Sequence, residues 1–376
     1  MLKEISLEHF KCFKKATVPL SALTLLTGFN SSGKSTLLQA ILLLHQTMNE
    51  NEWSSNLKLN GQALRLGSVR DILNNQHSKQ SFSVSLTFDA HKISWTFSGE
   101  RDEMSMKILE VKVDESIKDT LVRLNCLIPE TSSTDVMKCV NLLRDVSYIS
   151  AERSGPKDSY VLVDKNDLRS AGSRGENVAS IIYWNGDTEI SEQLAISDEP
   201  KTLLKQAEAR MNSIFPGSSF SVDKIPDINA LLLRYRTSPE GELHLPSNVG
   251  FGISQVFPIV IAGLSARQKD ILIIENPEVH LHPQGQSLLA YFLAEVAASG
   301  VQVLVESHSD HVLNGIRLAV LERILNSKDA SIQFFRLPDP NDERQIVDIM
   351  IDQDGRIADW PDGFFDQLSK DLLRFI

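Results

Sequence analysis

The sequence predicts an α/β protein with a central, mostly parallel sheet, an antiparallel β subdomain and an inserted helical or irregular region. Three observations lead to this prediction. Short segments at residues 271–274 and 301–305, apolar apart from Gln302, are typical of central parallel strands that are covered on both faces. Residues 81–113 alternate between apolar and polar side chains, which indicates an antiparallel meander. Near the N-terminus a glycine-rich loop lies between an apolar segment and a helical pattern, as in a strand, loop and helix unit.

Four segments follow from these patterns. Residues 1–149 hold at least two strands, the glycine loop, a helix from about Lys34 to Met48, and the meander, and they form the first half of one core. Residues 150–226 are irregular with one polar helical stretch, which predicts an insertion or helical lobe. Residues 227–336 alternate strands and helices and form the second half of the core. Residues 337–376 form a C-terminal segment of unknown function.

Composition and charge narrow the class of protein. The chain has 376 residues and 42% apolar side chains, enough for one large domain or two ordinary ones. Its longest apolar stretch, residues 256–264, is far shorter than the roughly 20 residues that cross a bilayer, and the N-terminus has no signal-peptide pattern, so we expect a cytoplasmic protein without membrane contact. The three cysteines form no CxxC pair. A net charge of −11 argues against a broad nucleic-acid surface but leaves room for a local basic groove.

The strongest motif is GFNSSGKST, residues 28–36, between an apolar strand and a helix. It has the spacing and the context of a P-loop, so an ordinary glycine turn before a helix explains it less well. The glycines let backbone N–H groups turn inward around phosphates, and the helix N-terminus adds partial positive charge. We expect Lys34 to reach the β- and γ-phosphates of ATP and Ser35 to bind Mg²⁺. The predicted nucleotide-binding residues are Gly28, Phe29, Asn30, Ser31, Ser32, Gly33, Lys34, Ser35 and Thr36.

A carboxylate at the end of a buried strand must complete such a site. Residues 271–274 are followed by Glu275, which we expect to direct Mg²⁺ in place of the more common Asp. The next residue, Asn276, stands where many ATPases of this shape have a second acid, and its amide cannot act as a base. Glu278 follows beyond a rigid proline and is the candidate that orients the attacking water. The alternative is that Glu278 is an acid favoured by the dipole of a helix that starts near Gln284.

A second buried strand, residues 301–305, leads to His308. An imidazole at such a strand end can donate a hydrogen bond to the γ-phosphate and report its presence. Four of the nine histidines fall in this region and raise the alternative of a metal cluster: His280, His282, His308 and His311. Because HxH and HxxH pairs without cysteine are weak zinc patterns, helix capping and γ-phosphate sensing explain these residues more simply.

The segment NVGFGISQVFPI places Ser254 among glycines. A hydrolase nucleophile elbow needs GxSxG, but Val256 stands where the second glycine would be, so the spacing excludes an elbow. The segment instead favours a second phosphate-binding helix start, with Gly250, Gly252, Ser254 and Gln255 as its residues. One chain does not need two such helix starts for one nucleotide. Two chains packed head to tail would use both.

Together these motifs resemble those of a known group. The set GFNSSGKST, NVGFGISQVFP, IIENPEVHLHP and ESHSDH is similar to the ABC-type ATPase heads of the SMC/RecF and OLD (overcoming lysogenization defect) group. The resemblance implies an ABC-type P-loop fold in which GFGISQ is the signature motif that contacts the partner's ATP. It also implies that ENPEVHLHP contains Walker B and the D-loop and that His308 is the switch histidine. YISAERSGP, GSRGEN and DWPDGFFDQ resemble a narrower subgroup of small bacterial ATPases with relatives in anti-phage defence systems.

The resemblance implies an ATP-dependent switch with catalytic residues Lys34, Glu278 and His308, which forms a homodimer or higher oligomer over ATP and Mg²⁺. OLD nucleases carry a Toprim domain that we do not expect after residue 301, so the controlled nuclease or toxin would be a separate effector protein. Two alternatives stay open. Asn276 favours a non-hydrolysing scaffold with ATP as a structural ligand, and the SMC/RecF likeness favours a DNA-repair or DNA-end-recognition ATPase. A transporter subunit is disfavoured because the usual LSGGQ-like form is absent.

Several residues keep two interpretations. Arg153 and Arg174 either reach phosphates across a dimer or form surface salt bridges. Gln62 and Gln76 are equal candidates for the glutamine of the Q-loop. The acidic turns DPND and DQDG near the C-terminus resemble a metal site in composition only.

Overall fold

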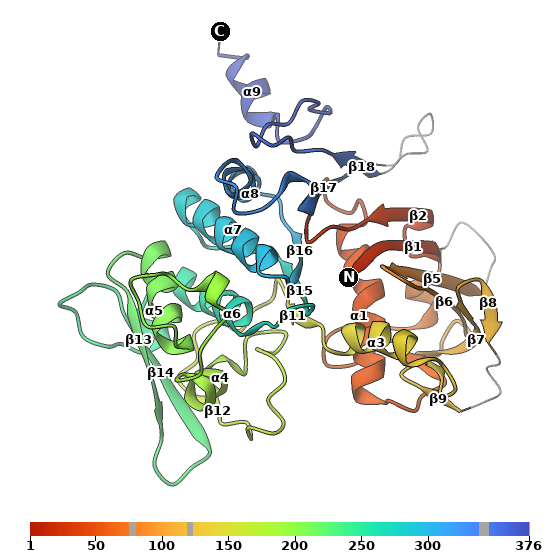
Figure 1. The fold of residues 1–376 in the computed structure, drawn as a ribbon, viewed down its shortest axis with the longest axis horizontal. Helices are drawn as coiled ribbons and strands as arrows, with labels where there is room; N and C mark the ends of the chain where they lie inside the picture. The colour runs from red at the N-terminus through yellow and green to blue at the C-terminus, as the bar shows by residue number, and fades with distance from the viewer. Residues whose placement is uncertain (75–79, 119–122, 338–345, 376) are drawn as a thin grey trace. The chain divides into compact units, whose positions relative to one another are not determined.

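The computed structural model describes residues 1–74, 80–118, 123–337 and 346–375, and the chain forms two compact units (Figure 1). Unit 1 comprises Met1–Val146, Ser331–Ile349 and Pro361–Phe364, and unit 2 comprises Ser147–Ala330, Met350–Trp360 and Phe365–Ile376. Both units contain helices and strands, which confirms the predicted α/β class. Within the described ranges no helix is long and apolar enough to cross a membrane.

The predicted meander is part of an antiparallel sheet in unit 1. In spatial order its strands are β2 (Phe13–Pro19), β1 (Leu2–Phe10), β5 (Ser81–Phe88), β6 (Lys92–Ser98), β7 (Ser105–Val113) and β4 (Asn56–Lys58), with β8 (Ser116–Lys118) on β7. Every second side chain of β5 is buried, because a pleated strand alternates its faces. Trp95 of β6 is fully buried, and its indole N–H donates to the carbonyl of Leu127 at 2.9 Å. The sheet therefore buries one apolar face without leaving this polar group unpaired.

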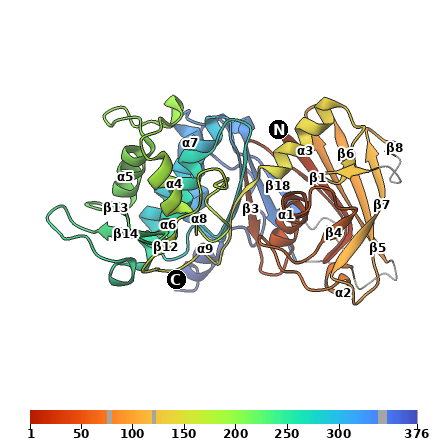
Figure 2. The ribbon, with the colours of Figure 1, turned by 90° about the horizontal axis from the view of Figure 1, so that it is seen from below.

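The strand, loop and helix of the sequence prediction lie in the same unit. β3 (Leu23–Gly28) leads through the glycine loop into α1 (Lys34–Glu50), which ends at Glu50 rather than at about Met48. Figure 2 shows α1 between β3 and β4, with α3 (Thr134–Arg144) beside it. β3 neighbours β17 (Ala330–Phe335), which pairs antiparallel with β18 (Ile346–Ile349). Three short elements complete this unit: α2 (Val69–Ile72), β9 (Leu124–Asn125) and β10 (Ile128–Pro129).

Unit 2 holds the buried parallel strands. β11 (Ser147–Ile149), β15 (Ile271–Glu275) and β16 (Gln302–Glu306) pair in parallel, and the register places Glu275 opposite Glu306. The first four residues of β15 and all of β16 are buried, as the apolar residues of both strands predict, and the buried set of β16 also includes Gln302 and Glu306. The helices of this part are α6 (Phe251–Ser265), α7 (Pro283–Ala298) and α8 (Asp310–Leu321), and α7 lies beside α8 (Figure 1).

The region predicted as an insertion has regular structure of its own. It includes α4 (Val178–Asn185), α5 (Leu203–Ile214), the 3-10 turn η1 (Glu192–Leu194), β12 (Tyr160–Val161) and β13 (Ser219–Lys224), and both strands pair with β14 (Ala230–Arg236). Tyr235 of β14 packs edge-on against Phe257 of α6, so the small sheet buries one side on that helix. The remaining elements are η2 (Pro246–Asn248), η3 (Ser327–Asp329) and α9 (Gln367–Leu372). The four predicted segment boundaries stay predictions.

Candidate nucleotide-binding and hydrolysis site

The glycine loop of unit 1 has a backbone that favours glycine. Gly28, Ser31 and Gly33 have positive φ angles of 133°, 62° and 107°. A Cβ on Gly28 would lie 2.1 Å from the carbonyl oxygen of Phe335, and a Cβ on Gly33 would lie 2.3 Å from the ring of Phe13. Both ends of the loop therefore require glycine, because of the backbone angle and because neighbouring atoms leave no room for a side chain.

The side chain of Lys34 lies inside the glycine loop. Its side chain is 3% exposed, and its Nζ donates to the carbonyl oxygens of Phe29 at 2.6 Å and Gly28 at 3.1 Å. Ser32 Oγ donates to the same Phe29 carbonyl at 2.7 Å. The ammonium group therefore lies within the turn that the loop makes, and the position of Phe29 determines where that group is held.

These features fit a triphosphate and its metal ion. Among the described residues no acidic side chain occupies the first turn of α1 and no side chain caps its N-terminus. The partial positive charge of the helix end is therefore not neutralised locally. Asn30 and Ser31 are exposed at the rim of the loop. Ser35 lies in the first helical turn, the position from which a P-loop hydroxyl binds Mg²⁺.

Glu275 ends β15 in unit 2 and is partly buried. Its carboxylate accepts the N–H of Ala151 at 3.2 Å and the phenol of Tyr148. Burial raises the pKa of Glu275, against the opposing effects of these two hydrogen bonds and of the Arg153 charge. Burial and the charge of Glu275 also raise the pKa of Tyr148. Tyr148 therefore stays protonated near neutral pH and keeps donating to the carboxylate.

Glu278 is fixed by the segment that follows β16. Its carboxylate accepts hydrogen bonds from Ser307 Oγ and from the N–H of His308, both at 2.9 Å. Asn276 has a left-handed φ of 44°, and its amide makes a longer contact of 3.5 Å with Glu278. α7 begins only at Pro283, with no acidic residue in its first turn, so Glu278 is not a first-turn helix acid. It is held instead between the chain segments that leave β15 and β16.

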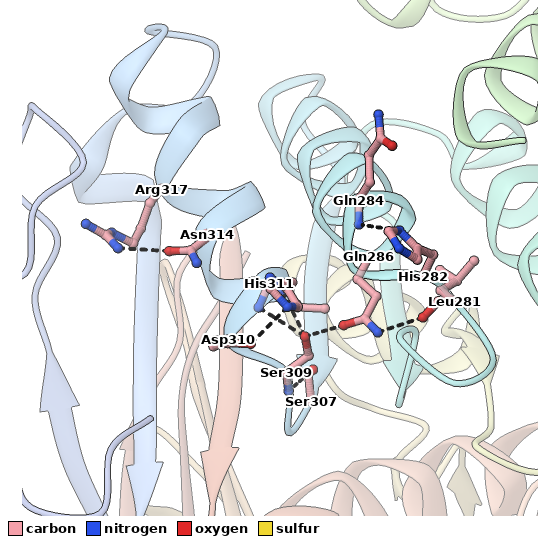
Figure 3. A network of polar contacts seen from close by, with 11 residues as sticks. Leu281, His282, Gln284, Gln286, Ser307, Ser309, Asp310, His311, Asn314 and Arg317 are labelled. Atoms are coloured by element: carbon pink, nitrogen blue, oxygen red, sulfur yellow. Dashed lines mark hydrogen bonds and ion pairs between the residues drawn. The ribbon is translucent and has the colours of Figure 1, made fainter. Parts of the chain in front are cut away.

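Ser307, which donates to Glu278, belongs to a polar network that joins these segments to α7 and α8; Figure 3 shows this network. Ser307 Oγ accepts the N–H of Ser309 at 3.1 Å, and Ser309 Oγ caps α8 by accepting the N–H of His311 at 3.1 Å. Ser309 Oγ also donates to Gln286 Oε1 at 2.5 Å, and the Gln286 amide donates to the carbonyl of Leu281 at 2.9 Å. α7 and α8 thereby fix the two segments that position the Glu278 carboxylate.

The four clustered histidines have separate surroundings. His280 packs edge-on against Phe251 with ring centroids 4.6 Å apart, and His282 Nδ1 accepts the N–H of Gln284 at 3.4 Å as the N-cap of α7. His308 is exposed at the end of the segment that holds Glu278. Across the described ranges no group of three or more His, Cys, Asp or Glu side chains could hold a metal ion. In the part of the chain that the structure describes, these four histidines are therefore not gathered into one cluster.

Arg153 is a buried connection rather than a surface arginine. Its guanidinium donates four hydrogen bonds, to Gln255 Oε1 at 3.1 Å and to the carbonyls of Ser150 at 3.1 Å, Glu275 at 2.8 Å and Asn276 at 2.8 Å. Its side chain is 6% exposed, and burial lowers its pKa to about 10, so it stays charged near neutral pH. Both sequence interpretations of Arg153 miss this role, in which it joins α6 to the turn after β15.

The signature-like segment starts α6. Gly250 and Phe251 are exposed at the helix start, whereas Ser254 and Gln255 are 4% and 3% exposed. A Cβ on Gly252 would lie 2.7 Å from the carbonyl oxygen of His280, so this glycine permits close packing of the helix start. The role of all four predicted residues toward a partner's nucleotide stays a prediction. The exposed part that a second chain could reach is the start at Gly250.

The other candidate residues from the sequence lie on the surface or outside the described residues. Arg174 pairs with Glu152 at 3.3 Å on the surface, as one of its two interpretations states. Gln62 is exposed, and its backbone N–H donates to Glu50 at 2.6 Å, whereas Gln76 and the DPND turn lie outside the described residues. Sequence reasoning missed the network of serines after β16. A serine directly before a helical pattern is a capping signal, and this signal could have revealed Ser309.

The chain has the fold of SMC head domains, which confirms the predicted ABC-type P-loop fold class. Residues 23–314 match the family described as "AAA domain, putative AbiEii toxin, Type IV TA system", and the chain belongs to this family. Residues 325–375 match a second family, described as "Protein of unknown function (DUF3696)".

Three individual proteins are similar to this chain. An "OLD nuclease" of Thermus scotoductus is 23% identical over 352 residues, which cover 88% of this chain but only 63% of the relative. An SMC head solved with the C-winged helix domain of ScpA has a TM-score of 0.55 at 13% identity, covering 93% of this chain and 97% of that one. The SMC head with an extended coiled coil bound to the C-terminal domain of ScpA, from Pyrococcus furiosus, has a TM-score of 0.54 at 12% identity, covering 100% and 99%. The predicted likeness to the SMC/RecF and OLD group is confirmed.

Proposed function

We propose that this protein binds Mg-ATP at residues 28–36, hydrolyses it and uses the nucleotide state as a switch. The observation that carries the proposal is Glu278, whose carboxylate is held by hydrogen bonds from Ser307 and His308. A carboxylate fixed in this way can orient a water molecule and accept its proton. The partly buried Glu275, three residues earlier at the end of β15, is the second carboxylate that the proposal uses.

Each candidate residue has one role in this proposal. Lys34 and the backbone N–H groups of the glycine loop stabilise the charge on the phosphates. Ser35 and Glu275 would hold Mg²⁺, which neutralises charge on the β- and γ-phosphate oxygens when it is bound. His308 responds to the γ-phosphate from the end of the segment after β16. Positioning and electrostatic stabilisation then supply most of the rate, as in other phosphoryl transfers.

We further propose that two chains associate head to tail over ATP and that the closed dimer controls a separate nuclease or toxin in anti-phage defence. The exposed start of α6 at Gly250 supports the dimer, because among its described residues no acid lies in the first turn to repel a partner's phosphates. The name of the OLD nuclease relative supports the kind of effector. The chain spans 63% of the length of that relative.

Phosphate release with Mg-ATP tests hydrolysis directly. We expect the wild type to turn over and Lys34→Ala and Glu278→Gln to lose turnover, with Glu278→Gln still binding ATP. Glu240→Gln, an exposed carboxylate in unit 2, is the matched control and should keep the wild-type rate. Light scattering of Glu278→Gln should show a dimer with Mg-ATP and not without it. An unchanged mass would contradict the switch.

A second function, an ATP-bound scaffold that does not hydrolyse, is favoured by Asn276. This residue stands at the position of the usual acid and points its amide toward Glu278 at 3.5 Å. An amide donor at that position stabilises the charged carboxylate but accepts no proton from water. Stoichiometric ATP binding without phosphate release, by wild type and Glu278→Gln alike, would select the scaffold. Turnover that depends on Glu278 would exclude it.

A further inference from the structure

Four residues of the C-terminal segment pack against the P-loop. Pro361–Phe364 belongs to unit 1, whereas the stretches before and after it belong to unit 2. The N–H of Phe364 donates to the carbonyl of Pro361 at 3.0 Å, and Gly363 has a φ of 80°, which defines a tight turn with glycine at its left-handed position. We call these residues the PDGF turn. They lie within the region that matches a family of unknown function.

The PDGF turn packs against the second residue of the P-loop. A Cβ on Gly363 would lie 2.5 Å from Cζ and 3.0 Å from Cε2 of Phe29, so the glycine touches the edge of this ring. Phe364 is fully buried and packs edge-on against Phe334, with ring centroids 5.3 Å apart. Phe334 in turn lies 6.1 Å from the ring of Phe29. The turn, the end of β17 and the P-loop therefore share one aromatic cluster.

β17 holds the same P-loop residue from its backbone side. The N–H of Phe29 donates to the carbonyl of Phe335 at 3.1 Å, and the tight contact between Gly28 and Phe335 leaves no space between the loop and the strand end. Phe29 is nevertheless 40% exposed, so its side chain is only partly covered. The PDGF turn supplies part of that cover and restricts the directions in which the ring can move.

The carbonyl group of Phe29 connects this packing to the residues of the proposed phosphate site. That carbonyl accepts hydrogen bonds from Lys34 Nζ at 2.6 Å and Ser32 Oγ at 2.7 Å. A displacement of the Phe29 ring that also rotates the adjoining peptide would move this shared acceptor. Packing at Gly363 is thereby connected to the ammonium group of Lys34 through a single residue.

We propose that the PDGF turn is a positioning element for the P-loop, which sets nucleotide affinity by holding Phe29 and, through its carbonyl, Lys34. The effect on nucleotide affinity rests on the proposed binding of ATP by this loop. The effect on loop geometry depends only on the packing of residues 361–364 on residues 28–34. The C-terminal segment thus gains a function in the nucleotide site although its motif carries no catalytic group.

Gly363→Ala is the central perturbation, because it inserts a methyl group against Phe29 at a left-handed backbone position. Gly355→Ala is the matched control: Gly355 has a φ of 71° in the same segment, but its Cβ would meet the carbonyl of Arg317 in unit 2, at 2.5 Å. We expect Gly363→Ala to speed hydrogen exchange of the amides of residues 28–36 and to weaken binding of a non-hydrolysable ATP analogue about 5- to 30-fold. Gly355→Ala should change neither.

Two further variants separate this coupling from a general loss of structure. In a Phe29→Ala background, adding Gly363→Ala should change analogue affinity less than about 2-fold, because the ring that transmits the displacement is absent. Phe364→Leu keeps an apolar side chain in the cluster and should speed exchange of the loop amides without unfolding the chain. Equal effects of Gly363→Ala in both backgrounds, or equal effects of Gly363→Ala and Gly355→Ala, would overturn the proposal.

Hydrogen exchange without nucleotide separates this proposal from the proposed function. If the wild type binds no ATP analogue, the proposed function fails, while faster exchange of residues 28–36 in Gly363→Ala alone still supports the positioning role. If the wild type binds the analogue and Gly363→Ala leaves both affinity and loop exchange unchanged, the positioning role fails while the proposed function stands.

Discussion

Replacing Arg153 by methionine removes a buried guanidinium and leaves its acceptors in place. Three of these acceptors are backbone carbonyls, of Ser150, Glu275 and Asn276, and the fourth is the side chain of Gln255. A buried pair can be exchanged for apolar groups at little cost when both partners are replaced, but backbone carbonyls cannot be removed. Each acceptor left without a donor costs about 1 kcal/mol or more, so the expected loss of unfolding free energy is about 3–5 kcal/mol.

This loss is large enough to measure by urea unfolding. With a slope of about 3 kcal/mol per molar urea, the midpoint should fall by about 1–2 M. Far-UV circular dichroism and tryptophan fluorescence should be followed together, because coincident curves are needed before a single free energy is assigned. Arg153→Lys keeps the charge but loses the planar fork, so it should lie between the wild type and Arg153→Met. A loss below about 1 kcal/mol for Arg153→Met would refute the argument that these four bonds join α6 to the turn after β15.

Three other predictions follow from individual contacts. Ser307→Ala removes a donor to Glu278 and should lower kcat about 3- to 30-fold with little change in the affinity for ATP. Steady-state phosphate release measures kcat, and equilibrium titration measures the affinity. A change in affinity alone would contradict the role of Ser307 in positioning the carboxylate. Ser309→Ala removes the cap of α8 and should cost about 0.5–2 kcal/mol in thermal or urea unfolding, whereas Ser213→Ala on α5 serves as an exposed control that should cost less. Burial lowers the pKa of His45, which is bonded to the carbonyl of Leu143 at 2.9 Å. Because the unfolded chain then takes up the proton first, this contribution to stability is complete above about pH 6.5 and is lost as the pH falls below it. His45→Gln should flatten the fall in melting temperature between pH 7.5 and 5.5, and an unchanged slope would exclude His45 as a cause.

The P-loop was predictable because every feature it needs is local in sequence. Gly28, Gly33 and Lys34 stand at fixed spacing between a strand and a helix, and the structure gives this stretch the backbone angles that the spacing requires. The same holds for Glu275, since a wholly apolar strand that ends in a carboxylate is visible without any long-range contact. Local patterns therefore located the glycine loop and the strand that ends in a carboxylate, whereas the roles of these residues in hydrolysis stay predictions.

Arg153 and Gly363 could not be located in this way. Arg153 lies in a polar loop, and its burial depends on Gln255 and Glu275, which are more than a hundred positions further along the chain. Gly363 belongs to a segment whose letters indicate a turn but not the ring against which it packs. Burial and packing partners over such separations are tertiary information, and no periodicity or spacing in one sequence records them.

The residue that follows Asn276 also affects how readily this asparagine can be converted to aspartate. Asparagine is among the few residues that occupy such a backbone angle readily, and the next residue is Pro277. Spontaneous conversion of asparagine to aspartate begins when the following backbone nitrogen, having lost its proton, attacks the carboxamide. Proline has no N–H to lose, so the cyclic imide cannot close here. The amide beside Glu278 is therefore protected from the imide route by which most asparagines are converted to aspartate.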